Sequence, residues 1–227
     1  MINYAGILMT GARAGVWYLR ELLNRARALN GDDFVLPVKT LSVPFHSINA
    51  LLPKKMALAS AKMLPYFQEM EILGVDKYIL ANITLHEAFD QVQHQISGTR
   101  ILHLHDIIRN TFNKGKKKIM IVGSMYTMRG SYLPSLFDHD HIEIVDASGV
   151  MQISLDELRR KFYNGNNRQL ANQVFDDLLQ QYPEVDAFVI ACTEHALALE
   201  EYPDKDRFIS LPHLQVEYLL NSQLKTS

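Results

Sequence analysis

Two segments of the sequence decide the fold: residues 75–82, Val-Asp-Lys-Tyr-Ile-Leu-Ala-Asn, and residues 185–192, Val-Asp-Ala-Phe-Val-Ile-Ala-Cys. They align without a gap, and each reads as an acidic start, a buried apolar strand, a small residue and a polar one. A weaker match, at nearly the same separation along the chain, joins residues 6–11 to residues 120–125. Internal repetition of this kind predicts two related halves.

Short apolar segments alternate with longer segments of helical period, which is typical of an α/β protein with mainly parallel sheets. We predict strands at residues 4–9, 34–43 (interrupted by Pro37), 77–81, 101–104, 118–122, 142–145, 187–191 and 208–210. Helices are predicted at residues 16–31, 56–73, 86–96, 106–112, 155–163, 168–182 and 214–224, the fifth with a capping box formed by Ser154 and Glu157. The first half is expected to comprise residues 1–97 and 208–227, and the second half residues 98–207.

The composition excludes several classes of function. The chain has 227 residues, of which 48% are hydrophobic, and a formal net charge of −2. Without clustered cations it is not expected to bind nucleic acid, and without an apolar stretch of about 18 residues it is not expected to span a membrane. Its one cysteine, Cys192, excludes an intramolecular disulfide and a cysteine-based zinc site. The first nine residues lack the features of a signal peptide, so we expect a cytoplasmic protein.

Cys192 follows a predicted buried strand and begins the polar sequence Cys-Thr-Glu-His at residues 192–195. Such a loop leads into the start of a helix, where backbone N–H groups and the helix dipole lower the pKa of a thiol below about 8.5. The position therefore predicts a thiolate that is usable near neutral pH. The alternative is an inert buried cysteine.

Residues 191–195 resemble the Cys-Thr-Glu motif that closes the second half of the aspartate/glutamate racemase superfamily. Three other segments are similar to motifs of that family, in the same order: residues 42–48 (Ser-Val-Pro-Phe-His-Ser-Ile), 102–106 (Leu-His-Leu-His-Asp) and 123–128 (Gly-Ser-Met-Tyr-Thr-Met). Residues 6–11 match the family's first motif poorly. The resemblance covers nearly the whole chain. It implies two similar Rossmann-like α/β domains related by pseudo-twofold symmetry, a homodimer, and cofactor-independent isomerase chemistry at an amino acid α-carbon between the domains.

The chain departs from the family at the end of the first half, where the family has Cys-Asn-Thr-x-His. Here the sequence reads Asn82-Ile83-Thr84-Leu85-His86, so the threonine and histidine are kept and Asn82 replaces the cysteine. The resemblance implies that Asn82 faces Cys192 across the substrate. Racemisation by two bases needs a proton acceptor and a proton donor on opposite faces of the α-carbon, and an amide serves as neither near neutral pH.

Three hypotheses about function remain open. The first is a racemase-like enzyme in which Cys192 is the single acid/base, slow or biased toward one enantiomer. The second is a one-cysteine decarboxylase of the same superfamily, in which the thiol protonates one face of an enediolate. The third is a catalytically impaired protein that binds a small carboxylate. All three take an amino acid or a small dicarboxylate as partner.

The residues expected to bind the substrate are hydroxyl side chains at predicted strand ends: Thr10, Thr84, Ser124, Thr127 and Thr193. Each is also suited to capping a helix. Lys54 and Lys55 are the nearest candidates for a cation that binds the substrate carboxylate. No metal site is expected, because residues 138–141 (Asp-His-Asp-His) read as a polar loop and His103 and His105, on one face of a predicted strand, lack a third ligand. His86 and His195 are expected at helix starts near the site.

Overall fold

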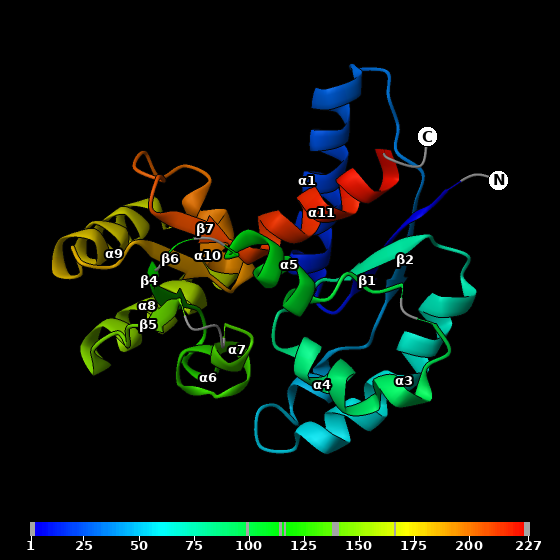
Figure 1. Ribbon diagram of the computed structural model, residues 1–227, viewed down its shortest axis with the longest axis horizontal. Coiled ribbons are helices and arrows are strands. Elements are labelled where there is room, and N and C mark those ends of the chain that lie inside the picture. Colours follow the sequence, from blue (N-terminus) through cyan, green and yellow to red (C-terminus); the bar gives the residue numbers. More distant parts are fainter. Residues whose placement is uncertain are drawn as a thin grey trace. The chain divides into compact units, whose positions relative to one another are not determined.

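The computed structural model describes residues 3–98, 100–113, 115, 117–137, 141–165 and 167–224. The chain divides into two units, the first made of Met1–Ile107 with His213–Ser227 and the second of Ile108–Pro212. Each unit contains one parallel sheet with helices beside it (Figure 1). The predicted α/β class with two similar, Rossmann-like units is therefore confirmed.

The first unit is built on a three-stranded parallel sheet in the order β2-β1-β3. Its strands are β1 (Ala5–Met9), β2 (Val38–Ser42) and β3 (Lys77–Leu80). The central strand β1 is almost fully buried, whereas β2 begins after Pro37 and is partly exposed at the edge, where a proline is tolerated. The helices of this unit are α1 (Ala12–Asn30), α2 (His46–Asn49), α3 (Met56–Ile72), α4 (Leu85–Val92) and the short 3₁₀ helix η1 (Gln93–Gln95).

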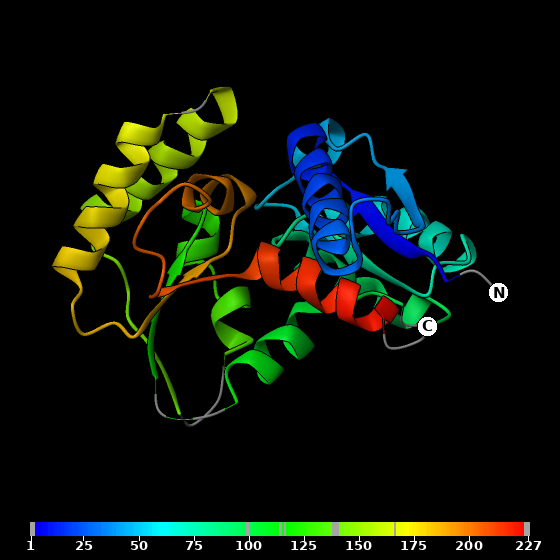
Figure 2. The ribbon, with the colours of Figure 1, turned by 90° about the horizontal axis from the view of Figure 1, so that it is seen from above.

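The second unit is built on a four-stranded parallel sheet in the order β5-β4-β6-β7. Its strands are β4 (Lys117–Val122), β5 (Ile142–Ile144), β6 (Ala187–Ile190) and β7 (Phe208–Ser210). Helices α8 and α9 lie side by side in this unit (Figure 2). Its helices are α6 (Met125–Arg129), α7 (Tyr132–Ser135), α8 (Gly149–Asn164), α9 (Arg168–Gln181) and α10 (Thr193–Leu199). The remaining helices, α5 (Leu104–Thr111) and α11 (Leu211–Leu224), each contain a boundary between the units.

The internal repeat of the sequence is a repeat of structure. Its two copies form β3 and β6, and each pairs in parallel with the first strand of its own unit, β1 or β4. The correspondence continues beyond the strands, because an arginine from a later segment bonds to the start of each copy. Arg100 donates to the carbonyl oxygen of Val75, and Arg207 Nε donates to that of Val185 at 3.1 Å.

The unit boundaries lie further along the chain than the sequence predicts, and strand pairing gives the reason. The predicted strand 101–104 is a single parallel bridge between Ile101 and Tyr78 of β3, so this segment stays with the first unit as far as Ile107. The predicted strand 208–210 forms as β7 but pairs with β6, so it belongs to the second unit. The chain returns to the first unit only at His213.

Helix α8 begins earlier than predicted, and the capping box of Ser154 and Glu157 is wrong. The helix starts at Gly149, and the side-chain oxygen of Ser148 accepts a hydrogen bond from the backbone N–H of Met151 at 3.2 Å. Ser154 lies inside the helix, where its hydroxyl donates to the carbonyl of Val150. The periodic spacing of apolar residues does not reveal the first turn of α8, because Val150 in that turn is apolar but 78% exposed.

Helix α11 is anchored in the first unit by a buried amide. Gln215 Oε1 accepts a hydrogen bond from the hydroxyl of Tyr18 at 2.5 Å, and Gln215 Nε2 donates to the carbonyl of Leu80 at 3.3 Å. The same Nε2 lies 3.1 Å from Nε2 of His86. Because an amide NH₂ only donates, His86 accepts there and its imidazole is neutral. No helix among the described residues is long and apolar enough to cross a membrane.

Candidate active site

Cys192 lies directly after β6, at the N-cap position of α10, with an extended backbone. Its side chain is half-buried, and its thiol donates a hydrogen bond to Oε2 of Glu194 across 2.7 Å. Glu194 lies in the first turn of α10. The thiol at the start of this polar sequence is therefore paired with a carboxylate two residues further along the chain.

This pairing overturns the expected thiolate. Burial raises the pKa of Cys192 well above its ordinary value, and the charge and hydrogen bond of Glu194 raise it further. The backbone N–H groups of Glu194 and His195 lower the pKa of the thiol, but by less. The thiol is therefore protonated at neutral pH, because burial and the carboxylate of Glu194 together outweigh the backbone N–H groups at the helix start.

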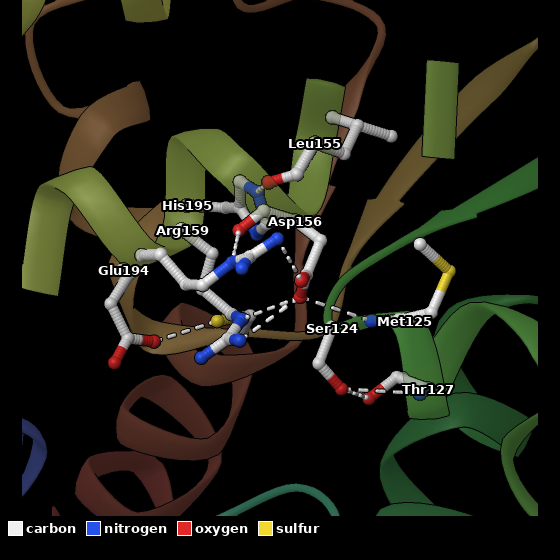
Figure 3. A network of polar contacts seen from close by, with 10 residues as sticks. Ser124, Met125, Thr127, Leu155, Asp156, Arg159, Glu194 and His195 are labelled. Carbon is white, nitrogen blue, oxygen red and sulfur yellow. Dashed lines mark hydrogen bonds and ion pairs between the residues drawn. The ribbon is translucent and has the colours of Figure 1, made fainter. Parts of the chain in front are cut away.

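His195 is held by helix α8 rather than by the thiol. Its ring is fully buried, and Nε2 lies 2.9 Å from the carbonyl oxygen of Leu155 (Figure 3). Since a carbonyl only accepts, the proton is on Nε2, and among the described residues Nδ1 has no hydrogen-bond partner. Burial lowers the pKa of His195 to about 4, so the ring is neutral at physiological pH.

Asp156, the next residue of α8, holds the loop that follows β4. Its Oδ1 accepts a hydrogen bond from the backbone N–H of Met125 at 3.3 Å and another from Arg159 Nε at 3.0 Å (Figure 3). Its Oδ2 lies 3.1 Å from Nη2 of Arg160. Burial raises the pKa of Asp156, but Arg159 and the other donors outweigh it, so the net shift is downward. Consecutive residues of α8 thus fix both loops.

The loop after β4 contains two of the predicted binding residues in contact. Ser124 Oγ lies 2.8 Å from Thr127 Oγ1 and accepts a hydrogen bond from the backbone N–H of Thr127 at 3.2 Å. Gly123 permits this tight loop, because a Cβ there would lie only 3.0 Å from Cβ of Thr127. Ala191 N donates to the carbonyl of Val122 at 2.7 Å, so this loop and Cys192 start from neighbouring strand ends.

The first unit carries the other predicted residues at the same end of its own sheet. Asn82 follows β3, and its Oδ1 accepts a hydrogen bond from the backbone N–H of Leu85 at 3.2 Å. Thr10 follows β1, is 1% exposed and donates to the carbonyl of Ala81 at 3.3 Å. Thr84 is half-buried at the start of α4 and makes no side-chain cap bond. Within each unit the predicted site residues therefore gather at adjacent strand ends.

No protein-family profile and no curated protein sequence matches the chain. Solved structures do match over nearly its whole length. An aspartate racemase homologue from Pyrococcus horikoshii has a TM-score of 0.79 and 15% identity, over 99% of this chain and 100% of the other. The chain has the aspartate/glutamate racemase fold. The Picrophilus torridus aspartate racemase has a TM-score of 0.72 and 15% identity, over 99% of this chain and 94% of the other. A glutamate racemase from Francisella tularensis, in complex with D-glutamate, has a TM-score of 0.60 and 15% identity, over 99% of this chain and 82% of the other.

The predicted lysines and histidines have other positions in this racemase fold. Lys54 and Lys55 are exposed in the turn before α3. His103 and His105 do not lie on a strand, because α5 begins at Leu104, and Nε2 of His103 lies 3.0 Å from a carboxylate oxygen of Asp90. Residues 138–140 of the predicted polar loop lie outside the described residues.

The residues of α8 that support the site cannot be recognised from the sequence pattern. Asp156 and Arg159 are three residues apart on one helix, a spacing that predicts an ion pair but not its contact with the loop after β4. The side chain of Arg159 is 28% exposed and is a cation held by Asp156 beside the loop after β4. Glu194 was visible in the sequence as the residue two positions after Cys192, although its effect on the thiol was not foreseen.

Proposed function

We propose that the protein belongs to the aspartate/glutamate racemase superfamily and moves a proton at the α-carbon of an amino acid or small dicarboxylate. Cys192 serves as its single acid/base, without a cofactor. The observation that carries the proposal is the position of the thiol, directly after β6, hydrogen-bonded to Glu194 and beginning at the strand end next to the loop of Ser124 and Thr127. The similarity of the fold to structures named as racemases supports it.

In this proposal Asn82 stands where the family has its other cysteine and faces the opposite side of the substrate. Its amide donates a hydrogen bond to a carboxylate or a water molecule, but it exchanges no proton near neutral pH. The thiol therefore serves one face of the α-carbon, and the opposite face depends on water. The enzyme is expected to exchange the α-proton of one enantiomer faster than it inverts that enantiomer.

Hydroxyl groups and one arginine are proposed to bind the substrate carboxylates. Thr84 and Thr193 are half-buried at the starts of their helices, and Ser124, Thr127 and Thr10 support them from neighbouring strand ends. Arg159 replaces Lys54 and Lys55 as the candidate cation, because Asp156 holds its guanidinium beside the loop after β4. A guanidinium is suited to a carboxylate because it offers five N–H donors in a planar arrangement.

The test is deuterium exchange at the α-carbon in D₂O, followed by proton NMR over a panel of L- and D-amino acids and small dicarboxylates. We expect exchange with at least one member of the panel and its loss in Cys192→Ala. Ser131→Ala, a change at the exposed residue that precedes α7, is the matched control and is expected to keep the exchange. Absence of exchange across the panel would sink the racemase proposal.

A second candidate, a one-cysteine decarboxylase, is favoured by the protonated state of Cys192. Loss of CO₂ from a substituted malonate leaves the bonding electrons on carbon as an enediolate, and a protonated thiol donates to that carbon. The thiolate then regains a proton from water. Release of CO₂ from substituted malonates, without α-proton exchange, would select this candidate. Tight binding of a dicarboxylate with neither reaction would select the impaired carboxylate-binding protein.

A further inference from the structure

Glu194, in the first turn of α10, contacts the thiol that precedes this helix. Its Oε2 lies 2.7 Å from Sγ of Cys192, a distance at which the S–H proton points at the carboxylate. The two residues belong to the strand end and first turn that also hold Thr193 and the buried His195. A thiol that donates to a carboxylate is not available as a base until its proton has moved elsewhere.

We infer that Cys192 and Glu194 share one proton, which rests on sulfur and passes to Glu194 whenever the thiol acts as a base. This inference rests on the proposed function for its catalytic part, but the sharing of the proton is a property of the protein alone. Glu194 is thus a positioning residue for Cys192. It sets the protonation state of the acid/base and does not itself contact the substrate.

The step balances in atoms and charge. The S–H bond of Cys192 breaks as an O–H bond forms on Glu194, which leaves a thiolate beside a neutral carboxylic acid. The thiolate then takes the α-proton, so the C–H bond breaks, a new S–H bond forms, and the electron pair stays on carbon, delocalised into the substrate carboxylate. The reverse sequence returns the proton to the same face. No oxidant, reductant or second substrate is needed.

The surroundings of the pair are consistent with one shared proton. Burial disfavours the charged form of Cys192, and a thiolate next to an ionised carboxylate adds repulsion between like charges. The other charged groups that act on this turn come from α8, namely Arg159 and Asp156, which influence the neighbouring His195 in opposite directions. Titration of such a pair is described by values that belong to the pair and not to either residue.

The experiment uses the full chain and its single thiol, so every thiol signal reports Cys192. The rate of alkylation by iodoacetamide is measured from pH 6 to 11 for the wild type, for Glu194→Gln and for Glu194→Asp. We expect Glu194→Gln to move the midpoint of the profile to lower pH and to raise the rate at pH 7.5 by about tenfold for each pH unit of the shift. Glu194→Asp keeps the carboxylate and is expected to retain much of the high midpoint.

Glu184→Gln makes the same change of charge at an exposed site in the same unit and is expected to leave the profile unchanged. A midpoint for Glu194→Gln that equals or exceeds that of the wild type would overturn the inference. The wild type gives a second reading that needs no variant. Its S–H stretching band in infrared spectra is expected at neutral pH and is lost only in alkaline solution, and its absence at pH 7 would also overturn the inference.

Deuterium exchange separates this inference from the proposed function. If the wild type exchanges α-protons, the pH profile of exchange is expected to move downward in Glu194→Gln together with the alkylation profile. A shifted alkylation profile without any α-proton exchange would sustain the shared proton and contradict the enzyme. An unshifted alkylation profile, together with α-proton exchange that depends on Cys192, would contradict the shared proton and support the enzyme.

Discussion

Among single residues, Asn82 is the one that we propose limits the reaction. Its Oδ1 accepts a hydrogen bond from the backbone N–H of Leu85, so the side chain stabilises the loop after β3 as well as occupying a predicted site position. A hydrogen bond of this kind contributes about 1 kcal/mol to stability. Asn82 is therefore compatible with the fold. It does not serve as an acid or a base, because an amide supplies no exchangeable proton near neutral pH.

Restoring a thiol at this position is expected to restore proton transfer on the second face. We predict that Asn82→Cys, alone or with Ile83→Asn, raises the rate of racemisation at least tenfold, since a positioned acid/base group contributes about 10²–10⁴-fold. The rate is measured by polarimetry or circular dichroism with the substrate found in the exchange panel. Asn82→Ala is the control and should give no gain. A folded Asn82→Cys protein that is no faster than the wild type would count against the proposed face-to-face arrangement.

At the scale of elements, α11 is held by hydrogen bonds and not only by apolar packing. Gln215 is fully buried and joins three polar partners, Tyr18, Leu80 and His86. One of these, the carbonyl of Leu80, belongs to the strand that ends just before Asn82. The helix at the end of the chain therefore stabilises the strand end that carries one of the predicted site residues.

Removing the amide is expected to remove three buried hydrogen bonds. We predict that Gln215→Leu lowers the free energy of unfolding by about 2–4 kcal/mol, since each hydrogen bond contributes about 0.5–1.5 kcal/mol. Urea denaturation followed by circular dichroism measures the change. Asn221→Leu, an amide exposed on the same helix, is the control and should change stability little. Equal stability of the two variants would show that the network is not needed.

In the molecule as a whole, each unit contains one fully buried histidine among its described residues, His86 in the first and His195 in the second. Burial lowers the pKa of both, with a further contribution from His103 to His86. The unfolded chain therefore binds more protons than the folded one below the ordinary histidine pKa of about 6.5. Stability is full above that pH and falls as the pH drops toward the folded value of about 4 for His195.

This loss of stability in acid is expected to depend on the buried rings. We predict that the His195 contribution to the free energy of unfolding falls by about 3 kcal/mol between pH 7 and pH 4. His195→Gln, whose amide can still donate to Leu155, should flatten the curve of stability against pH. His46→Gln, at an exposed position, should leave the curve as in the wild type. A His195→Gln curve as steep as that of the wild type would contradict the assignment.

The sequence predicts the parts of the structure that depend on local pattern. The repeated strands, the parallel pairing and the polar strand ends follow from segments such as 75–82 and 185–192, because parallel strands end at the same edge of a sheet. The rest depends on contacts between distant segments. The contact of Asp156 with Met125 and the bonds of Gln215 have no local signal. The protonated state of Cys192 has no local signal either, because burial of the thiol, together with the carboxylate of Glu194, outweighs the helix start in setting its pKa.

The central claim is that one thiol moves a proton on one face of the α-carbon. Its most direct test starts from a single enantiomer in D₂O and follows deuterium incorporation and inversion separately, by NMR and chiral chromatography. We predict that one enantiomer incorporates deuterium with retention, faster than its mirror image appears, and that Cys192→Ala abolishes this exchange. Equal rates of incorporation and inversion from both enantiomers, or exchange that persists in Cys192→Ala, would contradict it.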